Sequence, residues 1–242
     1  MTTATDEILE ASASTQQVEE RATELFREQR RAAMSQVDRV FLYLMLAQWA
    51  FGVAIAFMVS PSSWEGKVQT VHLHVQLALL LGGALSSLPI ALAIMRPGDA
   101  ITRHVMAVAQ VLWSALLIHL TGGRIETHFH VFVSLAFLAF YLDWAILVTA
   151  TVVVAGDHFF RGMLYPESVY GITNPEWWRF LEHAGWVVFE DVVLAWSCVI
   201  GLKEMKGIAF RQAEVEALKE REEAKSAALE MVLRELQPSP AA

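Results

Sequence analysis

Residues 119–132 read HLTGGRIETHFHVF, and this stretch separates two strongly apolar runs of the chain. It holds three histidines, one arginine and one glutamate. A charged side chain at the centre of a membrane-spanning helix costs about 2.5–3.5 kcal/mol on insertion scales. A polar cluster between two apolar runs therefore indicates the ends of two membrane spans and, because such groups are costly there, a candidate functional site.

The composition indicates a membrane protein. Of the 242 residues, 55% are hydrophobic and 18% are charged, whereas a soluble domain carries about 25% charged residues. The net charge of -8 argues against nucleic acid as a partner. Cys198 is the only cysteine, so no intrachain disulfide is expected. The polar N-terminus lacks the apolar region of a cleavable signal peptide.

Six apolar blocks predict an all-α, polytopic fold, a bundle of six transmembrane helices, because each block approaches the ~20 residues that a span requires. Residues 1–38 are expected to be a cytoplasmic segment, disordered to about residue 14 and then an amphipathic helix. Residues 39–202 form the predicted membrane domain, and residues 203–242 a cytoplasmic, coiled-coil-like helix. The predicted spans cover residues 40–59, 71–95, 101–120, 126–142, 145–160 and 181–202.

The orientation follows from lysine and arginine near the span ends, which favour the cytoplasmic side. Such residues precede the first span, occupy the turn after the second and follow the sixth. An even number of spans places both termini on one side. We therefore expect a multi-pass protein of a bacterial inner membrane, in contact with the lipid bilayer, with both termini in the cytoplasm.

The C-terminal helix carries an imperfect heptad pattern, which predicts a parallel homodimer through residues 203–236. The alternative is a single solvated helix. Five of the seven heptad positions are apolar, and the seven are Val215, Leu218, Glu222, Lys225, Leu229, Val232 and Leu236.

Under the predicted topology, seven of the eight histidines fall at one membrane face, opposite the termini. His104 falls at the other face and receives no role. Carboxylates accompany the seven histidines. The candidate metal ligands are His72, His74, His119, Glu126, His128, His130, Asp157, His158, His183 and Glu190.

Helical geometry limits which of these side chains point the same way. His128 and His130 differ by about 200° on an ideal helix, so both face inward only if the helix begins between them. The same condition applies to His72 and His74. We therefore expect only some of the histidines to be ligands.

Several imidazoles with a few carboxylates in an apolar bundle are typical of a transition-metal site. Iron, zinc and copper fit these donors, and haem held by two histidines is the other cofactor expected. Two alternatives need no metal. One is a proton-responsive histidine network, and the other is a set of structural histidines at the membrane interface.

Three segments, residues 122–132, 157–162 and 182–191, together resemble the N-terminal multi-span input domain of bacterial sensor histidine kinases and related signalling proteins. The resemblance covers roughly residues 38–202. It implies a membrane sensor whose last span continues into a signalling helix, and the chain is then either a stand-alone sensor that acts on a partner protein or a truncated piece of a longer protein. The sequence contains no phospho-acceptor helix pair and no ATP-binding lobe, so kinase activity is not expected.

We therefore expect a metal- or haem-binding signal-input module with its site near the extracytoplasmic face, and we favour this over an enzyme. The signal would pass through the last span into the C-terminal helix. The alternative is a membrane-bound, metal-dependent oxidoreductase of the non-haem iron or copper type. A transporter is disfavoured because the polar residues stay at one face.

Overall fold

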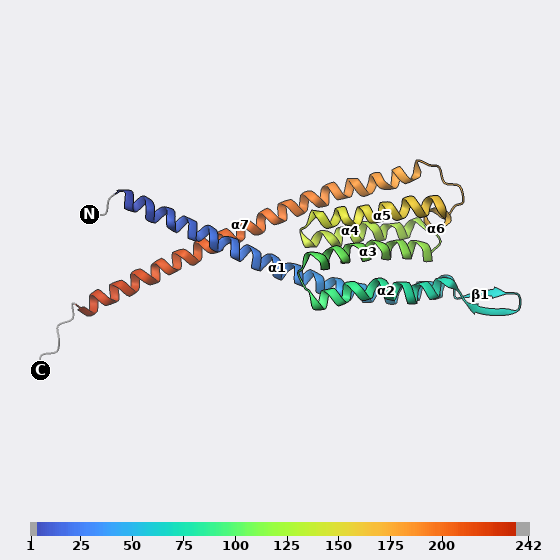
Figure 1. Ribbon diagram of the computed structural model, residues 1–242, viewed down its shortest axis with the longest axis horizontal. Helices are drawn as coiled ribbons and strands as arrows, with labels where there is room; N and C mark the ends of the chain where they lie inside the picture. The colour runs from blue at the N-terminus through green and yellow to red at the C-terminus, as the bar shows by residue number, and fades with distance from the viewer. Residues whose placement is uncertain (1–3, 236–242) are drawn as a thin grey trace, which may run out of the picture. The chain divides into compact units, whose positions relative to one another are not determined.

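The computed structural model describes residues 4–235, with side chains for residues 13–235 apart from residue 65. Leu236 of the predicted heptad pattern lies outside the described residues. Helices dominate the chain (Figure 1). The elements are α1 (Ala4–Val59), β1 (Ser62–Glu65), β2 (Val68–Val71), α2 (Leu73–Met95), α3 (Ala100–Leu120), α4 (Ile125–Leu138), the 3₁₀ turn η1 (Ala139–Tyr141), α5 (Trp144–Leu164), α6 (Glu167–Tyr170) and α7 (Arg179–Glu235).

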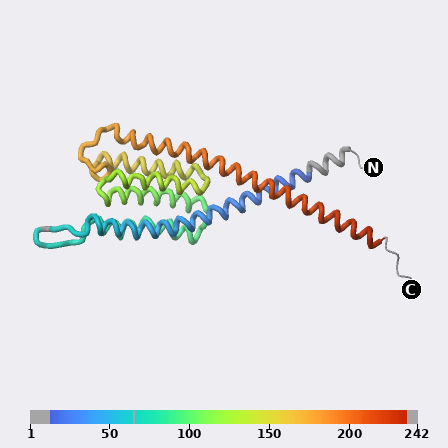
Figure 2. The backbone as a smooth tube through the Cα atoms, turned by 180° about the vertical axis from the view of Figure 1, so that it is seen from behind, coloured from blue at the N-terminus to red at the C-terminus, as the bar shows by residue number. Residues whose placement is uncertain are grey.

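The chain divides into two compact units. Residues 31–201 form the first unit, which we call the bundle. The described parts of residues 1–30 and 202–242 form the second, which we call the helix pair. Within the bundle, α3 packs against α2, α4 and α5, and Figure 2 shows this arrangement from behind.

Five helices of the described chain, α1, α2, α3, α5 and α7, are long and apolar enough to cross a membrane. The predicted fourth span is shorter, because α4 has 14 residues and η1 adds 3. Together they rise about 27 Å, slightly less than the ~30 Å of a bilayer core. The predicted all-helical class is thus confirmed, whereas the count of six spans stays a prediction.

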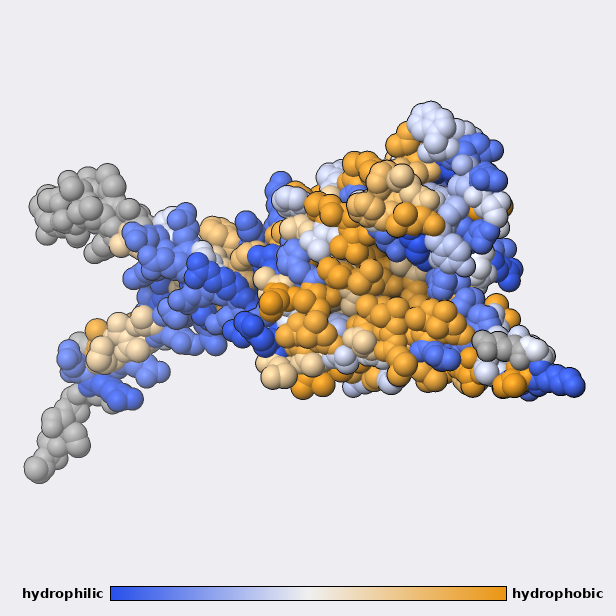
Figure 3. Space-filling model, turned by 45° about the vertical axis from the view of Figure 1, so that its right-hand side comes forward, coloured by the Kyte–Doolittle hydropathy of each residue, from blue (hydrophilic) through white to orange (hydrophobic). Residues whose placement is uncertain are grey.

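The surface of the bundle is apolar, as expected of a protein that faces lipid. Figure 3 shows hydrophobic residues over much of it. Large side chains such as Leu80, Phe189 and Trp196 are 76%, 66% and 67% exposed. Exposed apolar areas of this extent mark a membrane or protein interface, which supports the predicted membrane location.

Trp113 on α3 fills the centre of the bundle, because glycines on two neighbouring helices make room for its indole. A Cβ atom at Gly52 or Gly82 would lie 2.7 or 2.6 Å from the ring. The indole Nε1 donates a hydrogen bond of 2.9 Å to the Ser86 hydroxyl. The buried side chain thus keeps a partner for its one polar atom.

Two regions differ from the sequence-based expectation. Helix α1 begins at Ala4, so the structure places residues 4–14 in a helix and not in a disordered segment; alanine, a strong helix former, recurs there. Residues 62–71 form a two-stranded antiparallel hairpin, so α2 begins at Leu73 and not at residue 71 as predicted. The hairpin turn has Gly66 at φ +63°, a conformation that favours glycine in two-residue hairpin loops.

In the helix pair, α1 and α7 run antiparallel and meet through small side chains. Ala22 and Leu25 of α1 are buried there with Ala209 and Ala213 of α7. The hydrogen-bonded pairs show this antiparallel direction, because the residue numbers of the partners rise along α1 while they fall along α7. These pairs are Arg21 with Glu216 at 2.9 Å and Gln29 with Gln212 at 3.0 Å.

The heptad positions of α7 lie on a different face from this contact. Val215, Leu218, Leu229 and Val232 are 64%, 60%, 62% and 51% exposed. Position 215 is two residues from Ala213, which is about 200° around the helix. The contact with α1 therefore leaves the apolar heptad face uncovered within the chain, and the predicted homodimer stays a prediction.

Candidate functional site: two histidine groups

The structure brings six histidines into two groups of three at one end of the bundle. The first histidine group is His72, His74 and His119, whose neighbouring ring centroids lie 4.4 and 5.0 Å apart. The second histidine group is His128, His158 and His183. The His128 centroid lies 5.5 Å from that of His158 and 5.4 Å from that of His183.

The first group forms where α2 begins. Helix α2 starts at Leu73, between His72 and His74, which is the condition under which both rings face the same way. His72 is the N-cap, and its Nδ1 accepts a hydrogen bond of 3.0 Å from the His74 amide. His119, near the end of α3, has its Nδ1 2.7 Å from the Ser168 hydroxyl.

The second group joins three helices: His128 comes from α4, His158 from α5 and His183 from α7. Helix α5 continues to Leu164, past its predicted end, so His158 lies inside the helix. His128 and His158 are only 5% and 6% exposed. These two rings are therefore buried, whereas the His183 ring is half-buried.

One orientation is common to the second group: each Nδ1 lies within hydrogen-bond distance of the backbone carbonyl four residues earlier. A carbonyl oxygen only accepts, so each Nδ1 carries the hydrogen, and in a neutral ring Nε2 then holds the lone pair. The Nε2 of His128 is buried without a hydrogen-bond partner among the described residues. The carbonyls belong to Arg124, Val154 and Arg179, at 3.0, 3.1 and 2.9 Å.

His130, in contrast, lies apart from both groups. Helix α4 begins at Ile125, before His128 and His130 alike, so the two rings diverge as the helical period requires. The His130 ring contacts the Gln48 amide nitrogen at 3.0 Å and the Ser114 hydroxyl at 2.8 Å. It is a hydrogen-bonded core residue in this structure.

Of the three predicted carboxylate ligands, Asp157 alone touches a grouped histidine in the described structure. Its Oδ2 lies 3.2 Å from Nδ1 of His158. Glu126 is exposed and pairs with Arg124 at 3.5 Å. Glu190 is half-buried, and its Oε2 is buried with no hydrogen-bond partner in the described chain.

A polar chain that the sequence did not reveal connects the two groups. The Ser168 hydroxyl, near His119, accepts a hydrogen bond of 2.9 Å from Arg161. Arg161 also pairs with Asp157 at 2.6 Å, and Asp157 touches His158. From the sequence, only the contact between Asp157 and Arg161 could have been predicted, because their i,i+4 spacing places them on one helix face. Nothing in the sequence pointed to Ser168.

Two glycines bring α6 and its loop against the histidine end. Gly123, in the turn after α3, and Gly171, after α6, have φ of +73° and +69°. A Cβ atom at Gly123 would lie 2.3 Å from the Gly171 nitrogen, so only glycine permits this backbone contact. The contact sets Tyr170 with its ring 5.7 Å from the His183 ring.

The second histidine group lines a cavity of about 100 Å³ whose other walls are mainly apolar. Beside it, a groove of about 610 Å³ reaches the polar ends of α4 and α7. Both include His128 and His183. Within residues 4–235, no group of three or more histidine, cysteine, aspartate or glutamate side chains is arranged so that it could hold a metal ion.

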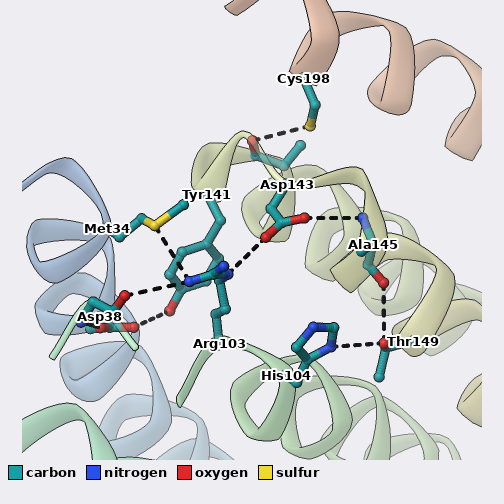
Figure 4. A network of polar contacts seen from close by, with 11 residues as sticks. Met34, Asp38, Arg103, His104, Tyr141, Asp143, Ala145, Thr149 and Cys198 are labelled. Atoms are coloured by element: carbon teal, nitrogen blue, oxygen red, sulfur yellow. Dashed lines mark hydrogen bonds and ion pairs between the residues drawn. The ribbon is translucent and has the colours of Figure 1, made fainter. Parts of the chain in front are cut away.

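A second polar network lies at the opposite end of the bundle (Figure 4). The buried Asp38 accepts hydrogen bonds of 2.6 Å from the Tyr141 hydroxyl and from the Gly98 amide. Arg103 pairs with Asp143 at 2.8 Å, and both side chains are largely buried. Asp143 is the N-cap of α5, so its ion pair with Arg103 joins α3 to the start of α5.

His104, to which the sequence gave no role, belongs to this end as well. Its Nδ1 lies 2.9 Å from the Thr149 hydroxyl on α5 (Figure 4). The Cys198 thiol on α7 is 3.6 Å from the Ala139 carbonyl oxygen. The polar contacts at this end of the bundle therefore include residues of α1, α3, α5 and α7.

Comparison with known proteins gives one similarity that bears on function. Over 118 residues, or 47% of the chain, the sequence is 34% identical to transducer protein Htr8 of Halobacterium salinarum. The matched part is 18% of the length of that protein. No protein-family model matches the chain, and no solved structure matches it.

This similarity relates the chain to a signal transducer, in agreement with the relationship predicted from the sequence. The narrower resemblance to kinase input domains stays a prediction. Neither the similarity nor the described geometry supports the membrane oxidoreductase alternative or the binding of a metal or haem, and the latter stays a prediction.

Proposed function

We propose that this chain is a membrane-embedded signal-input module, in which ligand binding at the histidine end changes the state of α7. The observation that carries this proposal is the continuity of α7, a single helix of 57 residues. His183 lies in its second turn and belongs to the second histidine group. Ala209 and Ala213, further along the same helix, belong to the helix pair.

The similarity to a transducer supports a signalling role. In our proposal, the helix pair passes the signal to a partner protein, and the exposed heptad face of α7 pairs two copies of the chain. The lysine and arginine distribution supports placing both termini in the cytoplasm. The histidine end would then face the extracytoplasmic side of the membrane.

The ligand that we propose is a transition-metal ion or a haem iron held by imidazoles. Two groups of three histidines in an apolar bundle supply the nitrogen donors that such metals prefer. A ligand alters a conformational equilibrium only through its different affinity for the two states. A ligand that bridges α7 to other helices meets this requirement if the helices differ in position between the states.

A chimaera tests this proposal: the chain fused to a kinase core, reconstituted in vesicles, and exposed in turn to Zn²⁺, Cu²⁺ and haemin. We expect at least one of the three probes to change kinase output. Replacing Lys203 and Glu204 together by glycine should abolish the response, since each glycine weakens a helix by about 1 kcal/mol relative to alanine. Both side chains are exposed on α7.

The matched control replaces Lys203 and Glu204 by alanine, which removes the same side chains and preserves the helix. This variant should respond as the wild type does. The proposal would be contradicted if none of the probes changed the kinase output and if the glycine pair and the alanine pair gave the same output.

A further inference from the structure

We propose that His128, His158 and His183 form a mononuclear site for a late first-row transition-metal ion such as zinc or copper, with one coordination position left for an exchangeable small ligand. This inference rests on the proposed function and deepens it, because it names the ligand and the residues that hold it. Four observations support it, namely ring orientation, ring spacing, the oriented carboxylate and the adjacent cavity.

The ring orientation is that of metal-binding histidines. Such residues bind with one ring nitrogen while the other donates to a carbonyl or carboxylate, which fixes the ring and its tautomer. In the second histidine group all three Nδ1 atoms make this contact with a backbone carbonyl. All three Nε2 atoms are thereby left as lone-pair donors, and that of His128 is buried without a partner in the described chain.

The ring spacing favours a single ion over a haem. With metal–nitrogen bonds of about 2.0–2.1 Å, an imidazole centroid lies about 3.2 Å from the metal, so tetrahedral angles place neighbouring centroids about 5.2 Å apart. Two axial imidazoles on opposite sides of a haem would have centroids about 6.4 Å apart by the same arithmetic. The observed spacings are 5.5 and 5.4 Å.

In the described structure the three side chains are not arranged so that they could hold a metal ion. The proposal therefore requires the rings to rotate until the three Nε2 atoms point to a common position. Such a movement would draw α4, α5 and α7 together around the ion. This is the differential contact with α7 that the proposed function requires.

A carboxylate supports one of the rings. Asp157 Oδ2 lies 3.2 Å from Nδ1 of His158 and is itself held by Arg161 at 2.6 Å. A carboxylate behind a ligating histidine raises its basicity and fixes its direction. Asp157 is therefore a positioning residue in this proposal and not a ligand.

The cavity of about 100 Å³ at the second group is far smaller than the roughly 300–1,000 Å³ of pockets for organic ligands. It nevertheless has room for a metal-bound water, which needs about 10–15 Å³. Three histidines with a fourth, exchangeable position are an arrangement that zinc adopts. The adjoining groove, which includes His128 and His183, supplies a route for the ion.

The first histidine group lacks this pattern. The Nδ1 of His72 accepts a hydrogen bond from the backbone amide of His74, so it carries a lone pair and its ring is oriented by helix capping. The His119 ring is oriented by Ser168. These contacts account for His72 and His119, whereas the Nδ1 of His74 is buried without a hydrogen-bond partner in the described chain.

The test uses the full chain with a tag that contains no histidine, purified in mild detergent, stripped with a chelator and titrated with Zn²⁺ or Cu²⁺ alone. Elemental analysis after desalting should give one ion per chain. His128→Ala, His158→Ala and His183→Ala should each weaken binding 10-fold or more, whereas His104→Ala, at the opposite end of the bundle, should bind as the wild type does. Co²⁺ in the site should show the visible absorption of tetrahedral coordination.

A wild-type chain that binds neither Zn²⁺ nor Cu²⁺ would overturn the inference, as would binding that is kept in all three alanine variants of the second histidine group. If a variant fails to fold, histidine modification by diethyl pyrocarbonate is measured on the wild type instead. Zinc should protect His128, His158 and His183, and unchanged modification at these positions would count against the site.

The outcomes for the site and for the proposed function are separable. A chimaera that responds to haemin, together with a wild-type chain that binds neither ion, would remove the three-histidine site and keep the signal-input function. One bound ion per chain in a chimaera that responds to no probe would keep the three-histidine site and remove the signal-input function.

Discussion

The Tyr141 hydroxyl donates a hydrogen bond of 2.6 Å to the carboxylate of Asp38, although 103 residues separate the two in the chain. Asp38 is 0% exposed and Tyr141 is 1% exposed. Their bond joins α1 to the connection between α4 and α5. A buried carboxylate that loses a donor is costly, so this pair is a sensitive test of how the bundle is held together.

Tyr141→Phe should destabilise the bundle by about 1–3 kcal/mol, because one oxygen of the buried Asp38 then lacks its hydroxyl donor. Denaturant unfolding in detergent micelles, followed by circular dichroism, measures the change. Tyr43→Phe is the matched control, since Tyr43 is 71% exposed, and it should leave stability unchanged. Equal stability of the two variants would show that the Asp38 contact contributes nothing.

Gly82→Ala should destabilise the protein by about 1–3 kcal/mol through overpacking, since the new Cβ would lie 2.6 Å from the buried Trp113 ring. Gly156→Ala provides the contrast, because no other atom lies within 4 Å of a Cβ there. The same change at that position should be neutral or stabilising by up to about 1 kcal/mol. Thermal unfolding of the two variants in one detergent measures the difference, and a reversed order would contradict the packing described.

Removal of metal should lower the unfolding temperature of the wild type if the three-histidine site exists. An ion at 100 times its dissociation constant stabilises the folded state by about 2.7 kcal/mol. Differential scanning calorimetry with Zn²⁺, and again after a chelator, measures the shift. His158→Ala should show none; an equal shift in this variant would place the ion elsewhere.

The heptad face of α7 should cross-link two copies of the chain. In a Cys198→Ser background, Leu229→Cys should form a disulfide-linked dimer in membranes under mild oxidation, because the residue is exposed and lies on the predicted seam. Ala227→Cys is also exposed but points about 200° away, so it should cross-link poorly. Cross-linking that is equal at both positions would argue against a parallel coiled coil.

The sequence by itself determined the helical membrane architecture, because apolar blocks of about 20 residues have few other stable structures. It also gave the condition under which neighbouring histidines face the same way, because the helical period is a local property, but it did not predict the helix starts that decide which pair meets this condition. His72 and His74 share a site since α2 begins between them. The rings of His128 and His130 point in different directions because α4 begins before both residues.

Only the tertiary structure decided which distant side chains meet. The membership of the second histidine group depends on how α4, α5 and α7 pack, and no spacing in the sequence encodes that packing. The same holds for the antiparallel contact of Ala22 with Ala209 and Ala213. Hydrophobic patterns specify which face of a helix is buried, whereas its partner depends on the shapes of side chains far away in the chain.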